Sequence, residues 1–327
     1  MVLNAAYRLG LELLPDYSCK FSRHAFTLAQ LFACLVLREF FGLSYRRTEG
    51  LLRDTPQWLA DIGLAVSPDH NTLWRAFDLI LKEQRVNRAL DRLAEHFAEA
   101  GLLRLSSKPL AMDSTCFERQ HRSDHYDRRC RQMAGKQQAQ GRSKKVKTPE
   151  KPGKWGKSVN ASRSRQLRSM PKLSVAVASA CHVILAAKVR IGNGSDAPDF
   201  DPLLYRSWKR ASVKVVVADA GYDSEANHRI ARQDMNVRSI IPPDIGRPTS
   251  KLPSGRWRRH MAKRMQRKAD QKLYGQRAQS ETVHSMIKRN QSSALRSRTP
   301  ERRKKEMLLR VLTHNIMLLC AEEEKRG

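Results

Sequence analysis

The sequence contains no long apolar run and no secretory signal. Its best apolar stretch, residues 25–41, is interrupted by Gln30, Arg38 and Glu39, whereas a membrane-spanning helix needs about 20 mostly apolar residues. The first residues lack the charged start and the cleavage site of a signal peptide. We therefore expect a cytoplasmic protein with no membrane partner.

Paired cysteines are also missing. The six cysteines are scattered without a C-x-x-C pair, at Cys19, Cys34, Cys116, Cys130, Cys181 and Cys320. Zinc sites and disulfide frameworks show regular cysteine spacings. The sequence therefore predicts neither of them, and reduced thiols are expected.

Acidic residues are scarce relative to basic ones. There are 62 Lys and Arg against 32 Asp and Glu, for a formal net charge of +30. This charge exceeds what solubility requires, and so dense a positive field favours a polyanionic partner. Nucleic acid is the first candidate, and an acidic membrane surface is the weaker alternative.

Residues 1–104 are predicted to form an all-α domain, with Gly42 and Gly101 ending helices and Ser44 and Asn71 capping their starts. The predicted helices cover residues 27–41, 45–53, 58–62, 72–81 and 84–100. Short helices joined by tight turns suit a helix-turn-helix, which would contact DNA through Asn71, Thr72 and Arg75. A plain helical bundle is an equally good interpretation, because helix-turn-helix geometry depends on turns that sequence does not determine.

Residues 105–327 are predicted to form a mixed α/β (α+β) domain. Predicted strands cover residues 109–115, 173–178, 183–191, 213–219 and 238–241, and predicted helices cover 201–209, 225–233, 274–288 and 303–323. This order is typical of a ribonuclease-H-like mixed five-stranded sheet with flanking helices. Residues 119–172 carry 17 Lys and Arg against three acids. They predict a mobile loop on the DNA backbone, with a solvated linker as the alternative.

Three acids are placed for metal-dependent chemistry. Asp113 and Asp219 end two strands that should be adjacent in the sheet, and Glu281 lies on a later helix. Three converging carboxylates repel one another unless cations intervene, and hard oxygen ligands select Mg²⁺ or Mn²⁺. Two such ions about 4 Å apart could drive an in-line displacement at a phosphodiester. Each acid alone would more often be a strand-end solubility residue or a cap.

Four polar residues around Glu281 keep a helical phase. Tyr274, Arg277, Glu281 and Lys288 fall within about 60° of one another at 100° per residue. A hydroxyl, a guanidinium, a carboxylate and an ammonium on one stripe suit a charged ligand, although a salt-bridged surface helix is the alternative.

Three further residues invite a functional interpretation. Trp257, within a basic run, could stack on an unpaired base, although a structural tryptophan is the more frequent case. His284, at the edge of the polar stripe, could orient a phosphate. Asp223, after the turn at Gly221, is predicted to be a loop or cap residue rather than a metal ligand.

The sequence resembles the bacterial insertion-sequence transposases of the DDE class that carry the Y-R-E-K signature. The signature is Tyr, two residues, Arg, three residues, Glu, six residues and Lys, and residues 274–288 match it without a gap. Asp113 in Ala-Met-Asp-Ser-Thr and Asp219 in Ala-Asp-Ala-Gly-Tyr-Asp are similar to the first two catalytic acids of that family. Flanking similarities include Phe41-Gly-Leu-Ser-Tyr-Arg, Pro68-Asp-His-Asn-Thr-Leu-Trp-Arg and Thr313-His-Asn-Ile. The resemblance spans nearly the whole chain.

The resemblance implies a metal-dependent recombinase of the bacterial cytoplasm and nucleoid, with double-stranded DNA as its partner. It would cleave the inverted-repeat ends of its own element and join the freed 3′-hydroxyls to target DNA, as a homodimer in the synaptic complex. The family's roles place two Mg²⁺ or Mn²⁺ ions on Asp113, Asp219 and Glu281. Its signature places Tyr274, Arg277 and Lys288 on phosphates near the cleaved end.

Two alternatives belong to other functional classes. A nuclease or resolvase would share the carboxylates. It would not need the N-terminal DNA-binding domain or the ordered tyrosine, arginine and lysine. A catalytically idle DNA-binding derivative would be free to lose an acid, and none is missing. The short separation between Asp219 and Glu281 leaves no room for the large β-rich insertion that some members use for hairpin-forming excision, which argues against that pathway.

Overall fold

The computed structural model describes residues 1–21, 24–103, 105, 108–120, 170–192, 194–244 and 252–326. The predicted basic loop at 119–172 therefore lies outside the described residues for nearly all of its length, from 121 to 169. Its two ends belong to strands.

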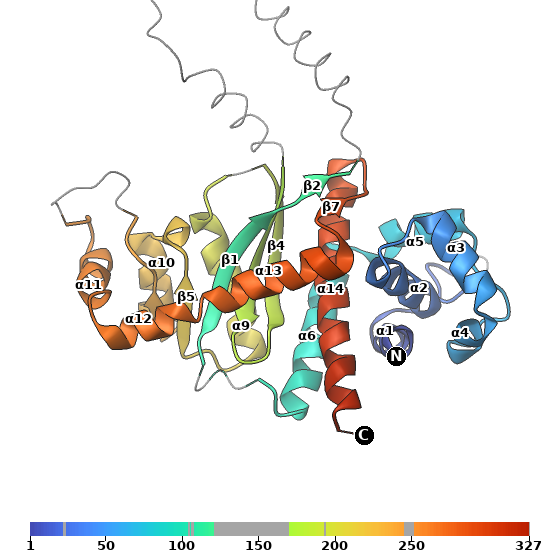
Figure 1. The fold of residues 1–327 in the computed structure, drawn as a ribbon, viewed down its shortest axis with the longest axis horizontal. Coiled ribbons are helices and arrows are strands. Elements are labelled where there is room, and N and C mark those ends of the chain that lie inside the picture. The colour runs from blue at the N-terminus through green and yellow to red at the C-terminus, as the bar shows by residue number, and fades with distance from the viewer. Residues whose placement is uncertain are drawn as a thin grey trace, which may run out of the picture.

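Helices make up the described N-terminal part of the chain (Figure 1). They are α1 (Val2–Leu13), α2 (Leu28–Phe40), α3 (Tyr45–Asp54), α4 (Pro56–Asp61), α5 (His70–Ile80) and α6 (Glu83–Glu99). The sequence predicted α2 to α6 but not α1. Local signals explain the predicted boundaries: Thr27 and Gln30 form a capping box at the start of α2, and Gly42 follows its end with φ +63°.

The start of α5 differs from the prediction. Asp69, not Asn71, is the N-cap, because its carboxylate accepts the backbone N–H groups of Asn71 and Thr72 and also the Thr72 hydroxyl. An ionised acceptor that satisfies three donors is a stronger cap than a neutral amide two residues later. Ser44, by contrast, caps α3 as predicted and accepts the N–H of Arg47.

A mixed five-stranded sheet forms the second part. Its strands are β1 (Leu110–Cys116), β3 (Pro171–Ala178), β4 (Val183–Ile191), β5 (Val215–Ala218) and β6 (Arg238–Ile240), in the order β4-β3-β1-β5-β6. Strands β4, β3 and β1 are antiparallel neighbours, whereas β5 and β6 run parallel to β1. This is the predicted ribonuclease-H-like topology. Strand β3 is buried along its whole length, so apolar layers cover both of its faces.

Helices flank this sheet. They are α9 (Phe200–Arg210), α10 (Glu225–Arg229) with the π-helical turn η3 (Ile230–Asp234), α11 (Arg256–Arg264), α12 (Lys268–Gly275), α13 (Ala278–Gln291) and α14 (Pro300–Glu324). Short 3₁₀ turns, η1 (Ala197–Asp199) and η2 (Ala220–Tyr222), complete the region. A two-residue ladder, β2 (Glu118–Arg119) with β7 (Ala294–Leu295), was not predicted.

The predicted continuous helix over 274–288 is instead two helices. Helix α12 ends at Gly275, and α13 begins at Ala278 after a turn at Gln276 and Arg277. Glycine is a poor helix interior residue, which explains a break at this point. The basic run from Arg256 is also helical, as α11, whereas the sequence indicated only its charge.

Helix α14 joins the two parts of the chain. It packs on β3, β4 and α13 of the second part and on α1, α2 and α6 of the helical part; in Figure 1 α6 lies on the sheet side of α14, and α1 and α2 lie on the other side. Leu308, Leu312 and Ile316 are buried in one apolar cluster that includes residues from both parts, and Leu319 packs against that cluster with partial exposure. The predicted boundary at 104/105 remains a prediction, but no break in the described core marks it.

Two further observations limit the possible interpretations. Among the described residues no single helix is long and apolar enough to cross a bilayer, and only α2 and α3 together, bent by 106°, meet those criteria.

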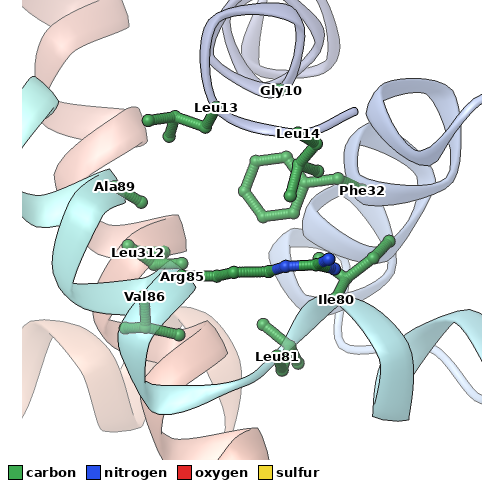
Figure 2. Close-up of a pocket in the computed structure, with 10 residues that line it drawn as sticks. All are labelled: Gly10, Leu13, Leu14, Phe32, Ile80, Leu81, Arg85, Val86, Ala89 and Leu312. Carbon is green, nitrogen blue, oxygen red and sulfur yellow. The ribbon is translucent and has the colours of Figure 1, made fainter. Parts of the chain in front are cut away.

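A cavity of about 20 Å³ lies between α1, α2, α6 and α14, and Figure 2 shows Arg85 crossing it between Phe32 and Leu81. The Arg85 guanidinium donates to the Leu79 carbonyl at 2.9 Å. This volume holds at most one water molecule, so it is a packing seam.

Candidate active site

The sheet places the first two acids side by side. In the parallel pairing of β1 with β5, Met112 is opposite Ala218, so Asp113 and Asp219 occupy the next positions on neighbouring strands. Neighbouring strands are about 4.8 Å apart, and side chains at matching positions of a parallel pair point to the same face. The prediction that both acids end their strands holds for Asp219, which directly follows β5, but not for Asp113, because β1 continues to Cys116.

Asp113 occupies a partly buried position. One of its oxygens accepts the backbone N–H of Ser114 at 2.8 Å. Burial raises the pKa of Asp113 to about 6; Ser114 and Arg277 oppose that rise, while Asp219 and Glu281 add to it. The three predicted acids therefore share one electrostatic environment, in which their like charges disfavour one another.

Helix α13 brings Glu281 to this edge. The helix crosses the sheet next to β1 (Figure 1), and Glu281 lies in its first turn with a half-exposed side chain. One Glu281 oxygen is 2.6 Å from Nη2 of Arg277, whose Nη1 is 3.4 Å from an Asp113 oxygen. A single guanidinium thus bridges two of the three acids.

The other two signature residues flank the same site. The Arg277 guanidinium is 5.9 Å from the centre of the Tyr274 ring, and burial raises the pKa of Tyr274, with Arg277 opposing and Asp219 adding to that effect. Nζ of Lys288 donates to the Thr115 hydroxyl at 2.6 Å. Tyr274, Arg277 and Glu281 therefore meet beside Asp113 although the helix is broken between them, and Lys288 lies further along β1, at Thr115.

His284 lies beneath this stripe and not at its solvent edge. It is 6% exposed, and its Nδ1 is 3.9 Å from Asp113 Oδ2. Burial lowers its pKa to about 3, with Lys288 acting in the same direction. The ring is therefore neutral at physiological pH, and it packs behind Asp113.

Comparison with known families agrees with this geometry. Residues 105–316, more than half of the chain, match the family described as Transposase DDE domain, and residues 6–79 match Transposase domain (DUF772). The chain belongs to the DDE transposase family. No curated protein and no solved structure matched the chain.

The donor chemistry of the transposase fits the divalent metal ions that are typical of its family. Asp113, Asp219 and Glu281 offer carboxylate oxygens only, which are the ligands of Mg²⁺ and Mn²⁺. A cation among them would relieve the repulsion from Asp219 and Glu281, which adds to the effect of burial on the pKa of Asp113. As the described side chains stand, no three Asp, Glu, His or Cys residues converge closely enough to hold a metal, because Glu281 is turned towards Arg277.

A fourth carboxylate beside the transposase's paired acids was missed by the sequence reading. Asp196 accepts the Ser114 hydroxyl at 3.0 Å and is ion-paired with Lys172 and Arg190 at 2.5 and 3.4 Å. A Cβ on Gly221 would lie 3.4 Å from its carboxylate. Asp196 thus links the residue after Asp113 to the turn after Asp219. The one sequence signal for Asp196 as a site residue is its position at the end of the Gly-Asn-Gly-Ser-Asp loop.

Asp223 has a different environment in the transposase. Its carboxylate accepts Nε of Arg258 at 2.7 Å and the backbone N–H of Asp244 at 2.8 Å, and its other oxygen is 3.5 Å from His228. These contacts hold η2 to the segment that leads to α11. They agree with the predicted loop role and leave Asp223 apart from the paired acids.

The remaining predicted DNA-binding residues lie far from the acids. Asn71 and Arg75 are exposed on α5, and Thr72 is part of the helix cap. Trp257 begins α11, at the opposite end of the transposase from α5 (Figure 1). The backbone N–H of Trp257 donates to the Glu225 carboxylate. The centre of its ring lies 5.0 and 5.1 Å from the guanidiniums of Arg232 and Arg256. These contacts favour a structural role for Trp257.

Proposed function

We propose that this transposase cleaves DNA at the inverted-repeat ends of its own element and joins the freed 3′-hydroxyls to target DNA. The observation that carries the proposal is the placement of Asp113 on β1 and of Asp219 directly after β5, each one residue beyond the paired Met112 and Ala218, with Glu281 on α13 linked to Asp113 through Arg277. The reaction would take place on double-stranded DNA of the bacterial nucleoid, with a homodimer holding the two ends together.

In this proposal Asp113, Asp219 and Glu281 hold two Mg²⁺ or Mn²⁺ ions. When bound, the ions would polarise the scissile phosphate and lower the pKa of the attacking hydroxyl or water. Binding requires the Glu281 carboxylate to exchange its contact with Arg277 for the metal. Arg277 is then released towards the substrate, which carries negative charge.

The cationic members of the signature would hold the DNA. The planar guanidinium of Arg277 can bind two oxygens of one phosphate, whereas Lys288 acts as a point charge. Lys288 already lies against Thr115, two residues after Asp113. The two side chains would fix the phosphates beside the cleaved bond and align the bond for attack.

The direct test is to incubate the protein with labelled duplexes that carry the terminal repeats of its element. We expect 3′ ends at the repeat boundary and joined products, both only when Mg²⁺ or Mn²⁺ is present. Cleavage without joining would indicate a nuclease or resolvase. Cleavage that is unaffected by chelation of divalent ions would contradict the metal assignment.

Substitution of the signature cations tests their roles. Lys288→Ala should lower strand transfer by about 10- to 100-fold, since a hydrogen bond to a charged group contributes about 1.5–3 kcal/mol. Nonspecific DNA affinity should change little, because one cation of 62 is removed. Arg277→Lys should also lower strand transfer although it keeps the positive charge, because an ammonium cannot reproduce the planar fork of the guanidinium.

The matched control is Arg289→Ala, which removes an exposed cation from the same helix. The measurement is strand transfer on labelled terminal DNA, alongside filter binding at one salt concentration. Equal transfer by Lys288→Ala, Arg277→Lys and the control would show that the stripe is a solvated helix face.

A further inference from the structure

A large basic groove lies outside the candidate active site. Its volume is about 850 Å³, and it runs between the starts of α3 and α5 and the segment that joins β7 to α14. Five arginines and no acidic residue are among the described residues that line it: Arg38, Arg47, Arg296, Arg298 and Arg302. Such a lining favours an anion.

Two of these arginines carry nitrogens without a partner. Arg38 is 3% exposed, and its Nε makes no hydrogen bond within the described structure. The same holds for Nη1 of Arg296, whose Nη2 donates to the Gly42 carbonyl at 2.5 Å. Buried donors are costly when unsatisfied. The wall of the groove therefore holds buried guanidiniums whose hydrogen bonds are incomplete, and their positive charge lies directly behind its surface.

The other walls are set for a phosphate chain. Ser44 and Thr299, the N-caps of α3 and α14, line the groove, and helix N-termini attract negative charge. The guanidinium of Arg302 stacks 3.7 Å from the centre of the exposed Trp74 ring. An ion pair with Asp78 also holds Arg302. Arg302 is thus fixed in place before any ligand arrives.

The groove extends towards α5, the helix predicted to contact DNA. An adjoining pocket of about 370 Å³ shares Ser44, Tyr45 and Trp74 with it and adds Arg46 and Asn71. A strand backbone in the groove would therefore pass beside the N-terminus of α5. The predicted contact of Asn71 with DNA and the arginine groove belong to one surface.

The groove is also close to the acids along the chain. Gln120 lines it and lies seven positions along the chain from Asp113, through the rest of β1 and through β2. Seven extended residues span at most about 25 Å, which corresponds to about seven nucleotides of B-form DNA. In Figure 1 the β2–β7 ladder lies between the sheet and helices α3 and α5.

We propose that this groove binds the phosphate backbone of the element-end duplex, within about seven nucleotides of the cleaved phosphate. The inference rests on the proposed function for the identity of the duplex. The two can fail separately, because the groove is tested by binding and the active site by cleavage.

The first experiment measures affinity for a 30-base-pair duplex with the terminal repeat, over a series of salt concentrations. Arg47 and Arg298 are exposed in the groove, so replacing both with Ala leaves the buried ion pairs intact. The double variant should lose about two phosphate contacts, which makes the log–log salt slope shallower by roughly 1.8. Arg47→Lys with Arg298→Lys should keep the original slope.

The matched control removes two exposed cations far from the groove, by Lys214→Ala with Arg229→Ala. Equal slopes for the groove and control variants would overturn the proposal. A groove variant that instead changes the mass of the DNA-free protein in sedimentation would also overturn it, since the groove would then bind a protein.

The second experiment locates the contact. Individual phosphates of the duplex are ethylated, and the modifications that weaken binding are mapped. We expect interference within about seven nucleotides of the cut, which disappears in the Arg47→Ala, Arg298→Ala protein and persists in the control. The same interference map for both proteins would overturn the placement. An Asp113→Asn protein should give the same interference map as the unsubstituted protein, because the map reports binding and does not depend on cleavage.

Discussion

Asp113→Asn should abolish DNA cleavage and leave duplex binding nearly unchanged. Asparagine keeps the shape of the side chain but removes the negative charge that a metal needs, and loss of one ligand from a shared site disables the whole site. We expect a fall in cleavage rate on the order of a thousandfold or more. Binding should persist, because the basic surface is not altered.

The control for this substitution is Asp201→Asn, which removes an exposed carboxylate from the start of α9. Cleavage and affinity are measured on the same labelled terminal duplex with Mg²⁺ present. Asp219→Asn and Glu281→Gln should behave as Asp113→Asn does. A variant of any of the three acids that keeps a tenth of the activity would remove that acid from the site.

Arg310→Met should lower the free energy of unfolding by about 3–5 kcal/mol, which is the usual effect of breaking a buried ion pair by removing one partner. Arg310, Glu39 and Glu306 are fully buried, and the guanidinium is 2.9 and 3.1 Å from the two carboxylates. It also donates to the carbonyls of Ser292 and Ala294. Methionine fills similar space but leaves these acceptors unpaired.

The electrostatics of Glu306 show why this charge is needed. Burial opposes its ionisation, but Arg310 and the N–H groups of Arg296 and Ser297 outweigh burial and hold the pKa of Glu306 below its ordinary value. Arg8→Met is the control, since the Arg8–Glu323 pair also joins the helical part to α14 but is exposed at both ends. That change should cost at most about 1 kcal/mol. Similar urea midpoints for the two variants would contradict the role of the buried network.

The sheet and its acids could be predicted because they depend on local patterns. The apolar run at residues 110–112 precedes Asp113, the apolar strand β5 precedes Asp219, and parallel pairing of these two runs brings the acids side by side. The polar stripe was predicted correctly in its membership but wrongly in its continuity. Tyr274 and Arg277 meet through a guanidinium over a ring, which the turn between α12 and α13 permits.

The features that were missed depend on pairs far apart in sequence. Nothing near Asp196 indicates that it would bond Ser114, and nothing near Arg310 indicates Glu39 as its partner. The arginine groove likewise joins Arg47 to Arg298 across most of the chain. Helical and strand periods report which face of an element is apolar. They do not report which charged side chain from another element will meet it.

The packing of α14 has a consequence for protein synthesis. Helices α1, α2 and α6 leave the ribosome long before the helix that covers them, and Glu39 is then without Arg310. Chain segments that lack their apolar and ionic partners remain partly unfolded. A chain interrupted before residue 300 would therefore be a target for proteases, and it would not accumulate as a shortened competitor of the full-length transposase, although it would carry Asp113, Asp219 and Glu281.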